Sequence, residues 1–236
     1  MNMSSITTPL KEVSKALVIF GAVFFAAGSF GAENSAADTS NLDQILTKIQ
    51  KNYDKSIGFS ALFEQTYKSS QGGVRSESTG KVFFRKPMMV RWEYLKPNKK
   101  IFIASNDDLW IYDPEDNQVM HSRKFSKEQF SIALSFLRGN ARLDNEFTAS
   151  IASTNETGWT LKLIPKTEQG NLAVVYLDVS KSTFLVTAVE IEDALGNKNR
   201  FKFLNVAMGD VAPVALFKFT PPPDAEVLSV PEGYTK

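Results

Sequence analysis

The segment GKVFFRKPMMVRWEY, residues 80–94, decides how the rest of this chain folds. Val82 and Phe84 alternate with charged residues, and this period of two predicts a β-strand with one apolar face. A second, mostly apolar run follows at residues 88–92. Arg85, Lys86 and Pro87 separate the two runs, which conflicts with the apolar pattern around them. Because such conflicts are expected at functional sites, we predict a functional role for this interruption.

Alternation of period two extends to both sides of this segment, and short turns rich in Gly, Pro, Asn and Asp separate most of the alternating runs. This arrangement predicts sequential hairpins, which form an antiparallel meander. Besides residues 80–94, the predicted strands are FSALFEQTY (59–67), KIFIAS (100–105), LWIYD (109–113), QVMHS (118–122), EFTASIAS (146–153), WTLKLIPK (159–166), LAVVYLDVS (172–180), TFLVTAVEIED (183–193), NRFKFLNV (199–206) and ALFKFTPP (215–222). The prolines at 221–223 are expected to end the last strand, because proline cannot serve a central ladder.

Two segments show helical spacing instead. In residues 41–53, apolar side chains recur on one face, and Ser40 is a suitable N-cap; the apolar residues are Leu42, Ile45, Leu46 and Ile49. Residues 124–140 interrupt the meander with a second amphipathic segment, for which Ser126 is a suitable N-cap and Gly139 a suitable C-cap. Each helix needs an apolar surface to cover.

These elements predict a mainly β protein, an incomplete antiparallel β-barrel made from one strongly curved sheet, with helices on its concave side. An unclosed barrel that is wide enough to leave space can hold a small apolar ligand. A fully packed core fits the same pattern of residues equally well. The sequence pattern alone leaves these two interpretations open.

Composition narrows the possible functions. The 236 residues suit one large β domain, and the formal net charge of +1 without a basic block gives no indication of nucleic-acid binding. The chain has no cysteine and a single histidine, His121, which has no metal-ligand spacing around it and is interpreted as a surface residue. The acidic stretch 113–117 (DPEDN) is predicted to be a hairpin turn. No nucleophile, phosphate or dinucleotide motif is present, so we expect no enzyme activity, no cofactor and no metal site.

The N-terminal residues have the pattern of an export signal. Lys11 and Lys15 precede the apolar run 16–28 (ALVIFGAVFFAAG), which is short for a bilayer span and is followed by small residues. We therefore predict a signal peptide over 1–31, a disordered leader over 32–39, one domain over 40–228 and a flexible tail over 229–236.

The order and spacing of FSALFEQ, GKVFFRKPMMVRWEY and DDLWIYDPEDNQV, followed by GNLAVVYLDV and ALFKFTPPPDAEV, resemble the periplasmic outer-membrane lipoprotein carrier family, LolA, over residues 40–228. This resemblance implies a half-barrel with a helical lid over an apolar cavity that takes the acyl chains of lipoproteins. It further implies a soluble periplasmic chaperone that receives acylated lipoproteins from an inner-membrane ABC transporter and delivers them to an outer-membrane lipoprotein acceptor. The acceptor is lipid-anchored through a cysteine, which this chain lacks. A monomer is expected.

The resemblance also assigns roles to individual residues. The cavity wall is expected to include Val82, Phe84, Val90 and Trp92, with ordinary core packing as the alternative. The underside of the lid is expected to consist of Phe130, Leu134 and Leu137, with a permanently packed helix as the alternative.

Two adjacent residues are candidates for the latch that holds the lid. The family usually has an arginine directly before the proline of this segment, whereas here Lys86 occupies that place and Arg85 lies one residue earlier. Alternation puts Lys86 on the face of Val82 and Phe84, so Lys86 is predicted to be the lid latch, and Arg85 is the alternative. An alternative function is a lipid- or peptide-sensing regulatory module on the same half-barrel.

Overall fold

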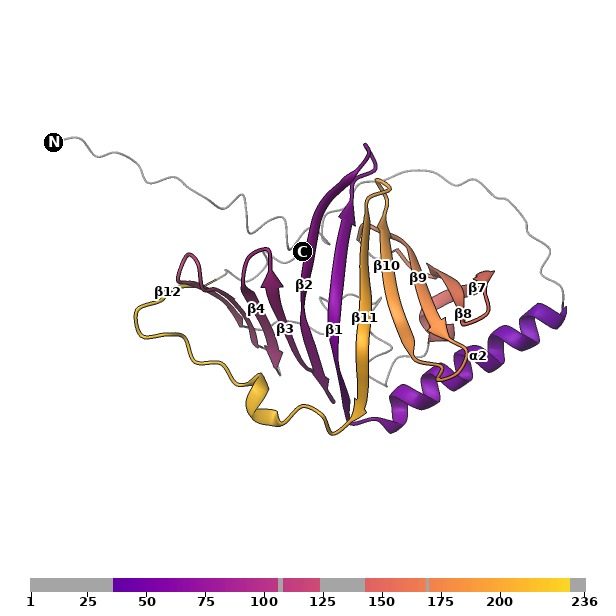
Figure 1. Ribbon diagram of the computed structural model, residues 1–236, viewed down its shortest axis with the longest axis horizontal. Coiled ribbons are helices and arrows are strands. Elements are labelled where there is room, and N and C mark those ends of the chain that lie inside the picture. Colours follow the sequence, from indigo (N-terminus) through magenta and orange to yellow (C-terminus); the bar gives the residue numbers. More distant parts are fainter. Residues whose placement is uncertain (1–35, 106–107, 124–142, 169, 230–236) are drawn as a thin grey trace.

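A computed structural model describes residues 36–105, 108–123, 143–168 and 170–229. Its strands form one curved 12-stranded sheet with the order β12-β6-β5-β4-β3-β2-β1-β11-β10-β9-β8-β7 (Figure 1). The strands are β1 (Gly58–Lys68), β2 (Val74–Arg85), β3 (Met89–Lys96), β4 (Lys100–Ser105), β5 (Asp108–Asp113), β6 (Gln118–Arg123), β7 (Phe147–Thr154), β8 (Gly158–Pro165), β9 (Leu172–Ser180), β10 (Val186–Asp193), β11 (Lys198–Gly209) and β12 (Glu226–Ser229). The predicted fold class, an open curved sheet in a mainly β protein, is confirmed.

The segment 80–94 forms the centre of this sheet. It supplies the end of β2 and most of β3, which pair antiparallel so that Val82 lies opposite Trp92 and Phe84 opposite Val90. On its other side β2 pairs with β1, and β1 in turn pairs with β11. The β1–β11 pairing joins residues more than a hundred positions apart, and it brings the two runs of hairpins into one sheet.

The helix α2 (Ala36–Lys55) covers one half of the inner face of the sheet, as the lower right of Figure 1 shows. All four apolar residues predicted for its buried face, Leu42, Ile45, Leu46 and Ile49, are buried in the main core, together with Tyr53. The core residues of the sheet come from β1, β2 and β3 and from β7 to β11. The apolar side chains that recur every second residue in the strands therefore pack against those that recur about every 3.6 residues in the helix, and together they form one apolar layer. None of the helices in the described ranges is both long and apolar enough to cross a bilayer.

The predicted strand 215–222 is wrong. Residues 210–225 instead cross the outer face of β3 to β6, and they include the short 3₁₀ helix η3 (Val214–Phe217). Phe217 is buried there, and Phe219 lies 5.6 Å from the ring of Trp110 and 5.7 Å from the ring of Tyr112. The alternation of residues 215–219 therefore serves packing on a sheet face, not pairing at a sheet edge. We call residues 210–225 the outer strap.

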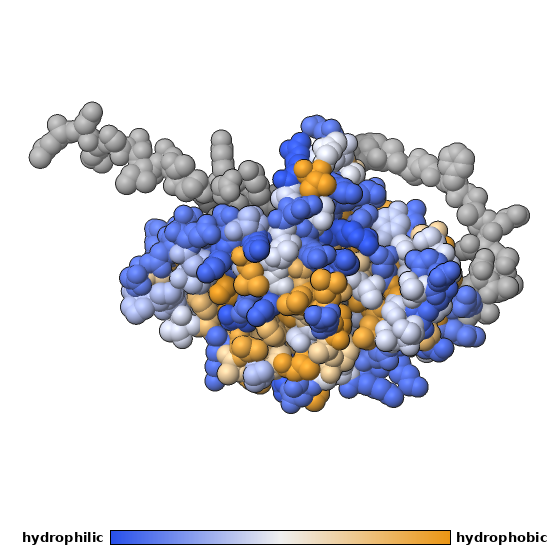
Figure 2. Space-filling model, in the orientation of Figure 1, coloured by the Kyte–Doolittle hydropathy of each residue, from blue (hydrophilic) through white to orange (hydrophobic). Residues whose placement is uncertain are grey.

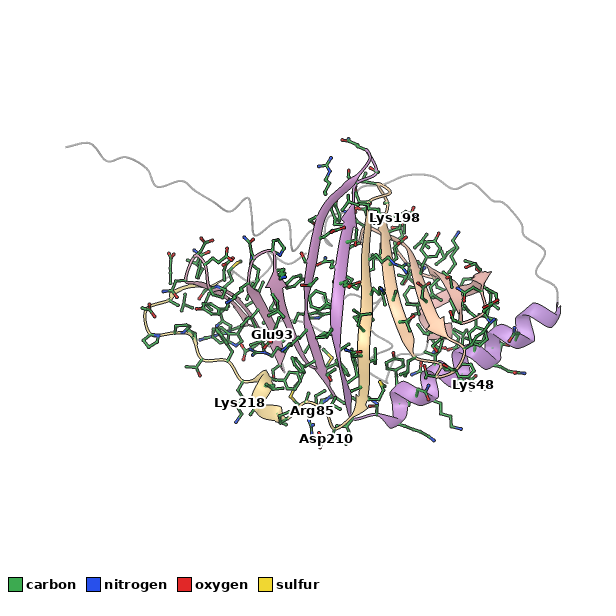
Figure 3. The ribbon with its side chains drawn as sticks, in the orientation of Figure 1. Lys48, Arg85, Glu93, Lys198, Asp210 and Lys218 are labelled. Carbon is green, nitrogen blue, oxygen red and sulfur yellow. The ribbon has the colours of Figure 1, made fainter. Side chains whose placement is uncertain are left out.

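Polar side chains of the sheet hold the outer strap, among them Arg85, Arg91 and Asn117. Arg85 forms an ion pair with Asp210, and Figure 3 shows the two residues together at the lower end of the sheet. Arg91 Nη1 donates a hydrogen bond to the Leu216 carbonyl (3.1 Å), and Asn117 Nδ2 donates one to the Asp224 carbonyl (3.0 Å). The strap then leads into β12, which pairs parallel to β6. The prediction that the sheet is antiparallel throughout is therefore wrong at this edge.

Regular structure extends into the regions that the sequence analysis assigned to the leader and the tail. α2 begins at Ala36, inside the stretch expected to be a disordered leader, and β12 includes Ser229, the first residue of the expected tail. Residues 1–31, expected to be a signal peptide, lie outside the described residues.

The outer face of the other half of the sheet is rich in charge. Arg200 pairs with Asp178 and lies 3.6 Å from Glu190, and Lys198 lies 3.2 Å from Glu192. Figure 2 shows blue polar surface over the hairpin tips, with apolar surface gathered over the lower ends of β1, β2 and β11. The inner face is therefore apolar, whereas the outer face is charged over β9 to β11 and apolar beneath the outer strap, where Ile103 and Val119 are buried.

Candidate functional site

The four residues predicted to form a cavity wall lie on the inner face of the sheet, side by side on β2 and β3. Val82, Phe84 and Val90 are buried in the main core, whereas Trp92 is half-buried and packs against that core. Phe84 also stacks on Phe59 of β1 at 5.7 Å. The first three residues therefore form the floor of the packed half of the interior, and Trp92 lies at its margin.

A cluster of aromatic rings surrounds Trp92. Phe63 lies at its centre, with ring centroids 4.9 Å from Trp92, 5.0 Å from Tyr94 and 6.1 Å from Phe201. Trp92 and Phe201 are 5.2 Å apart. Our sequence reasoning did not single out Phe63 or Phe201. The alternation of apolar residues in 59–63 and in 201–203 was the available signal, but the pairing of β1 with β11 could not be deduced from it.

The apolar inner face continues from Trp92 toward β6. Trp92 pairs with Phe102, Phe102 with Ile111, and Ile111 with Met120. Ile111 is buried, whereas Phe102 and Met120 remain half-buried. Together with Trp92 and Tyr94 they give the β3–β6 half of the inner face a row of large apolar side chains that are partly accessible. We call this row, Trp92, Tyr94, Phe102, Ile111 and Met120, the inner apolar row.

Polar pairs border this row at one end of the sheet. Lys100, the register partner of Tyr94, lies with its Nζ 3.1 Å from Asp113 Oδ2. On the neighbouring strands, Gln65 Nε2 donates a hydrogen bond to Asn199 Oδ1 (2.8 Å). The inner face thus changes from apolar to polar along the strands, which suits a ligand with an apolar body and a polar end.

At the opposite end of the sheet, Lys86 holds α2. Its Nζ donates hydrogen bonds to the carbonyls of Tyr53 and Asp54, each at 2.8 Å, in the last turn of the helix. Carbonyls in that turn have no partner within the helix, and a cation there is favourable. Arg85 points to the other face, where it binds Asp210 and the Ala212 carbonyl (3.0 Å). Adjacent cations therefore serve opposite faces, as strand alternation requires.

The residues predicted for the underside of a lid, Phe130, Leu134 and Leu137, lie outside the described residues. Within the described ranges, the carbonyls that Lys86 binds belong to α2. Lys86 therefore contacts the helix that the sequence predicted around residues 41–53.

His121 has partners that the sequence did not reveal. Its ring stacks on Trp110 at 3.6 Å, and its Nε2 lies 2.8 Å from Asp108 Oδ1. Both partners are on β5: Trp110 lies directly opposite His121 in the β5–β6 ladder, and Asp108 lies diagonally from it, opposite Arg123. The interpretation of His121 as a surface residue without a base partner is therefore wrong. Trp110 also contacts Phe219 of the outer strap, so this stack lies on the outer face and supports the strap.

The described part of the chain contains no group of three or more His, Cys, Asp or Glu residues that could hold a metal ion. The stretch 113–117 forms the predicted turn, in which Asp113 Oδ1 accepts a hydrogen bond from the Glu115 amide (3.1 Å). The site that the described residues offer is the apolar surface of the inner apolar row.

Two tyrosines, the buried Tyr53 and the partly buried Tyr94, predict a loss of stability in alkali. Burial raises the pKa of Tyr53, whose hydroxyl accepts a hydrogen bond from the Val186 amide, and burial also raises the pKa of Tyr94. In the unfolded chain tyrosine ionises near pH 10, so the stability that protonated tyrosine provides is fully present below about pH 10. Above it, the free energy of unfolding should fall by about 1.4 kcal/mol per pH unit for each tyrosine.

Urea unfolding between pH 8 and 11.5 measures this loss. Tyr53→Phe and Tyr94→Phe should each remove about half of the pH dependence above pH 10, because each removes one ionising group. Equal slopes in the wild type and in both variants would contradict the assignment.

A family model and two related proteins share one description. A family model described as "Outer membrane lipoprotein carrier protein LolA" matches residues 54–220. The outer-membrane lipoprotein carrier protein of Dechloromonas aromatica is 30% identical over 168 residues, which cover 71% of this chain and 79% of the relative. The protein of the same name from Methylococcus capsulatus is 27% identical over 181 residues, which cover 77% of this chain and 86% of that relative.

A solved structure supports the same fold. An uncharacterized conserved protein from Thermus thermophilus aligns with a TM-score of 0.52 at 15% identity, covering 80% of this chain and 99% of that one. At this identity the likeness concerns the fold alone.

Proposed function

Because the chain belongs to the family of outer membrane lipoprotein carrier proteins, LolA, we propose that it binds lipoprotein acyl chains on the inner face of its sheet. It carries them through the periplasm from the inner to the outer membrane. The observation that carries this proposal is the inner apolar row, whose large side chains are mostly only half-buried beside a fully packed core. A face of this kind gains free energy when an apolar ligand covers it.

Burial of an acyl chain would release more binding free energy than a carrier needs, because a carrier must also release its cargo. Each methylene group that leaves water contributes about 0.8 kcal/mol, so a single acyl chain would bind strongly if nothing opposed it. Release to a later acceptor therefore requires an opposing term. In the proposed cycle, cargo entry displaces the last turn of α2 and the lid from the inner face, and the free energy needed to separate them from that face lowers the net affinity.

Individual residues have distinct roles in this proposal. Trp92 forms part of the acyl-binding surface, and Val82, Phe84 and Val90 form the wall beneath it. Phe130, Leu134 and Leu137 form the underside of the lid. Lys86 is the latch, acting through its hydrogen bonds to the end of α2.

Tyr94 supplies a polar group within the inner apolar row. Within the described ranges its hydroxyl has no hydrogen-bond partner, and burial raises its pKa, so it stays protonated at neutral pH. A protonated phenol can donate a hydrogen bond to an ester or amide carbonyl at the head of an acyl chain.

The proposed partners are acylated lipoproteins, an inner-membrane ABC transporter that releases them and an outer-membrane acceptor. The protein works as a monomer in the periplasm after removal of its signal peptide. The names of the relatives favour a carrier over a lipid- or peptide-sensing regulatory module, and they are not names of enzymes.

Phe102→Asp tests the proposal. We expect at least a tenfold loss of affinity for a triacylated cysteine lipopeptide, because a charge on the inner face must lose its hydration when the acyl chain binds. Fluorescence titration of the mature chain gives the affinity. Leu62→Asp is the matched control, since Leu62 is 39% exposed and lies on the outer face of β1, and it should bind as the wild type does. Equal affinity of both variants and the wild type would refute binding on the inner face.

A further inference from the structure

The strand β7 ends the sheet and has an unusual sequence for an edge. Among the described residues it pairs with β8 alone, so no described strand pairs with its other side, which we call the open edge. Its residues, FTASIAST, include no charge and no proline. Edge strands usually carry charged residues or proline, because these residues prevent another strand from pairing with the free edge. The opposite edge, β12, has only four residues and begins with Glu226.

The hydrogen-bonding pattern shows which groups of β7 point outward. The Lys166 amide donates to the Glu146 carbonyl (2.9 Å), so the adjacent pair, Phe147 with Pro165, is a non-hydrogen-bonded pair of the antiparallel ladder. The pairs alternate along the strand. The amide and carbonyl groups of Thr148 and Ser150 therefore face β8, whereas those of Phe147, Ala149 and Ile151 face the open edge.

The open groups belong to residues that also form the inner face. Phe147 is part of the main core, and Ala149 and Ile151 pack against it. A strand added to this edge would therefore extend the inner face that the proposed function assigns to acyl chains. The side chains of Thr148, Ala152, Ser153 and Thr154 are exposed, although α2 also approaches β7.

We propose that the open edge of β7 binds the extended peptide that follows the acylated end of a lipoprotein, as an additional strand. This inference rests on the proposed function. Hydrogen bonds between main chains do not depend on side-chain identity, which suits a carrier of cargo proteins with different sequences. The absence of charge on β7 also avoids selection for or against charged tails.

Two lipopeptide probes test the inference with the whole mature chain. Both carry the same triacylated cysteine; one has a tail of two residues and the other a tail of ten uncharged residues. The long-tailed probe should bind about tenfold more tightly, the difference expected for a few main-chain hydrogen bonds after the cost of ordering the tail. A long-tailed probe that is N-methylated at alternate residues should lose this advantage, because it cannot complete the ladder, while the protein itself is unchanged.

Ala149→Pro removes an outward amide without breaking the β8 ladder, and proline is tolerated where the amide faces away from the sheet. This variant should bind the short-tailed probe as the wild type does and show no preference for the long tail. The matched control is Thr148→Ala, which leaves the main chain intact and should keep the tenfold preference.

The outcomes separate the inference from the proposed function. If both probes bind with equal affinity, the acyl site stands and the edge proposal is wrong. If neither probe binds, both the proposed acyl-binding function and the edge proposal are wrong. A tail preference that survives N-methylation and Ala149→Pro would place the tail elsewhere and overturn the inference. Sedimentation of the wild type as a dimer, with Ala149→Pro as a monomer, would show that a second copy of the chain occupies the edge, which also overturns it.

Discussion

Replacement of Phe63 by alanine is expected to lower the free energy of unfolding by about 3–5 kcal/mol, the range for large aromatic residues removed from a core. Phe63 is 1% exposed and contacts three other rings, those of Trp92, Tyr94 and Phe201. Its neighbour Gly80 leaves the space that the ring occupies, since a Cβ atom there would lie 2.6 Å from Phe63. Strands on both sides of the ring limit how far the site can collapse, so the cost should lie in this range.

Urea unfolding of the purified variants measures the effect. The matched control is Phe83→Ala, because Phe83 is on the outer face of the adjacent β2 and only half-buried. We expect the control to lose less than about 1.5 kcal/mol, in proportion to the smaller area that it buries. Similar losses for the two variants would mean that the inner cluster is not the centre of the core.

Phe63 also links stability to the proposed site. Trp92 and Tyr94 belong to the inner apolar row, and the rings of both pack edge-on against the Phe63 ring. The packed half of the interior therefore positions the half that remains partly accessible. This division explains why one apolar face can provide both a core and a binding surface: α2 covers the first part, and the described strands β3 to β6 provide the second.

The spacing of apolar residues along the sequence predicted the elements whose contacts lie close together in the chain. The apolar face of α2 and the strands on either side of Pro87 follow from periods of 3.6 and 2. The pairing of Val82 with Trp92 and of Phe84 with Val90 follows from one hairpin. These features use contacts between residues close in sequence, where a few side chains fix the register.

Features that depend on distant segments escaped prediction. Phe201 meets Phe63 and Trp92 only because β11 pairs with β1. The outer strap has the alternation of a strand but packs on a sheet face, and nothing in its sequence distinguishes an edge from a face. The stacking of His121 on Trp110 is a contact within one hairpin, and it was missed for another reason: the turn at 113–117 was predicted, but the register of the two strands on either side of it was not.

Replacement of Lys86 by methionine is expected to tighten binding of a triacylated lipopeptide about tenfold and to slow its release. Lys86 donates two hydrogen bonds to the last turn of α2. Hydrogen bonds to a charged group are worth about 1.5–3 kcal/mol when well protected, and since Lys86 is half-buried, about 1–2 kcal/mol is a reasonable share for the pair. In the proposed cycle cargo entry breaks these bonds. Without Lys86 that cost disappears, and about 1.4 kcal/mol corresponds to a tenfold change in affinity.

Three variants distinguish a latch from a merely structural lysine. Lys86→Met should lower the thermal midpoint of the cargo-free protein while raising its affinity, because it destabilises only the closed form. Lys86→Arg keeps the charge and the donors, so it should restore both properties toward the wild type. Lys51→Met, an exposed position on α2, should change neither. If Lys86→Met lowers the midpoint and leaves affinity and release unchanged, Lys86 stabilises α2 without opposing cargo, and another contact must supply the energy for release.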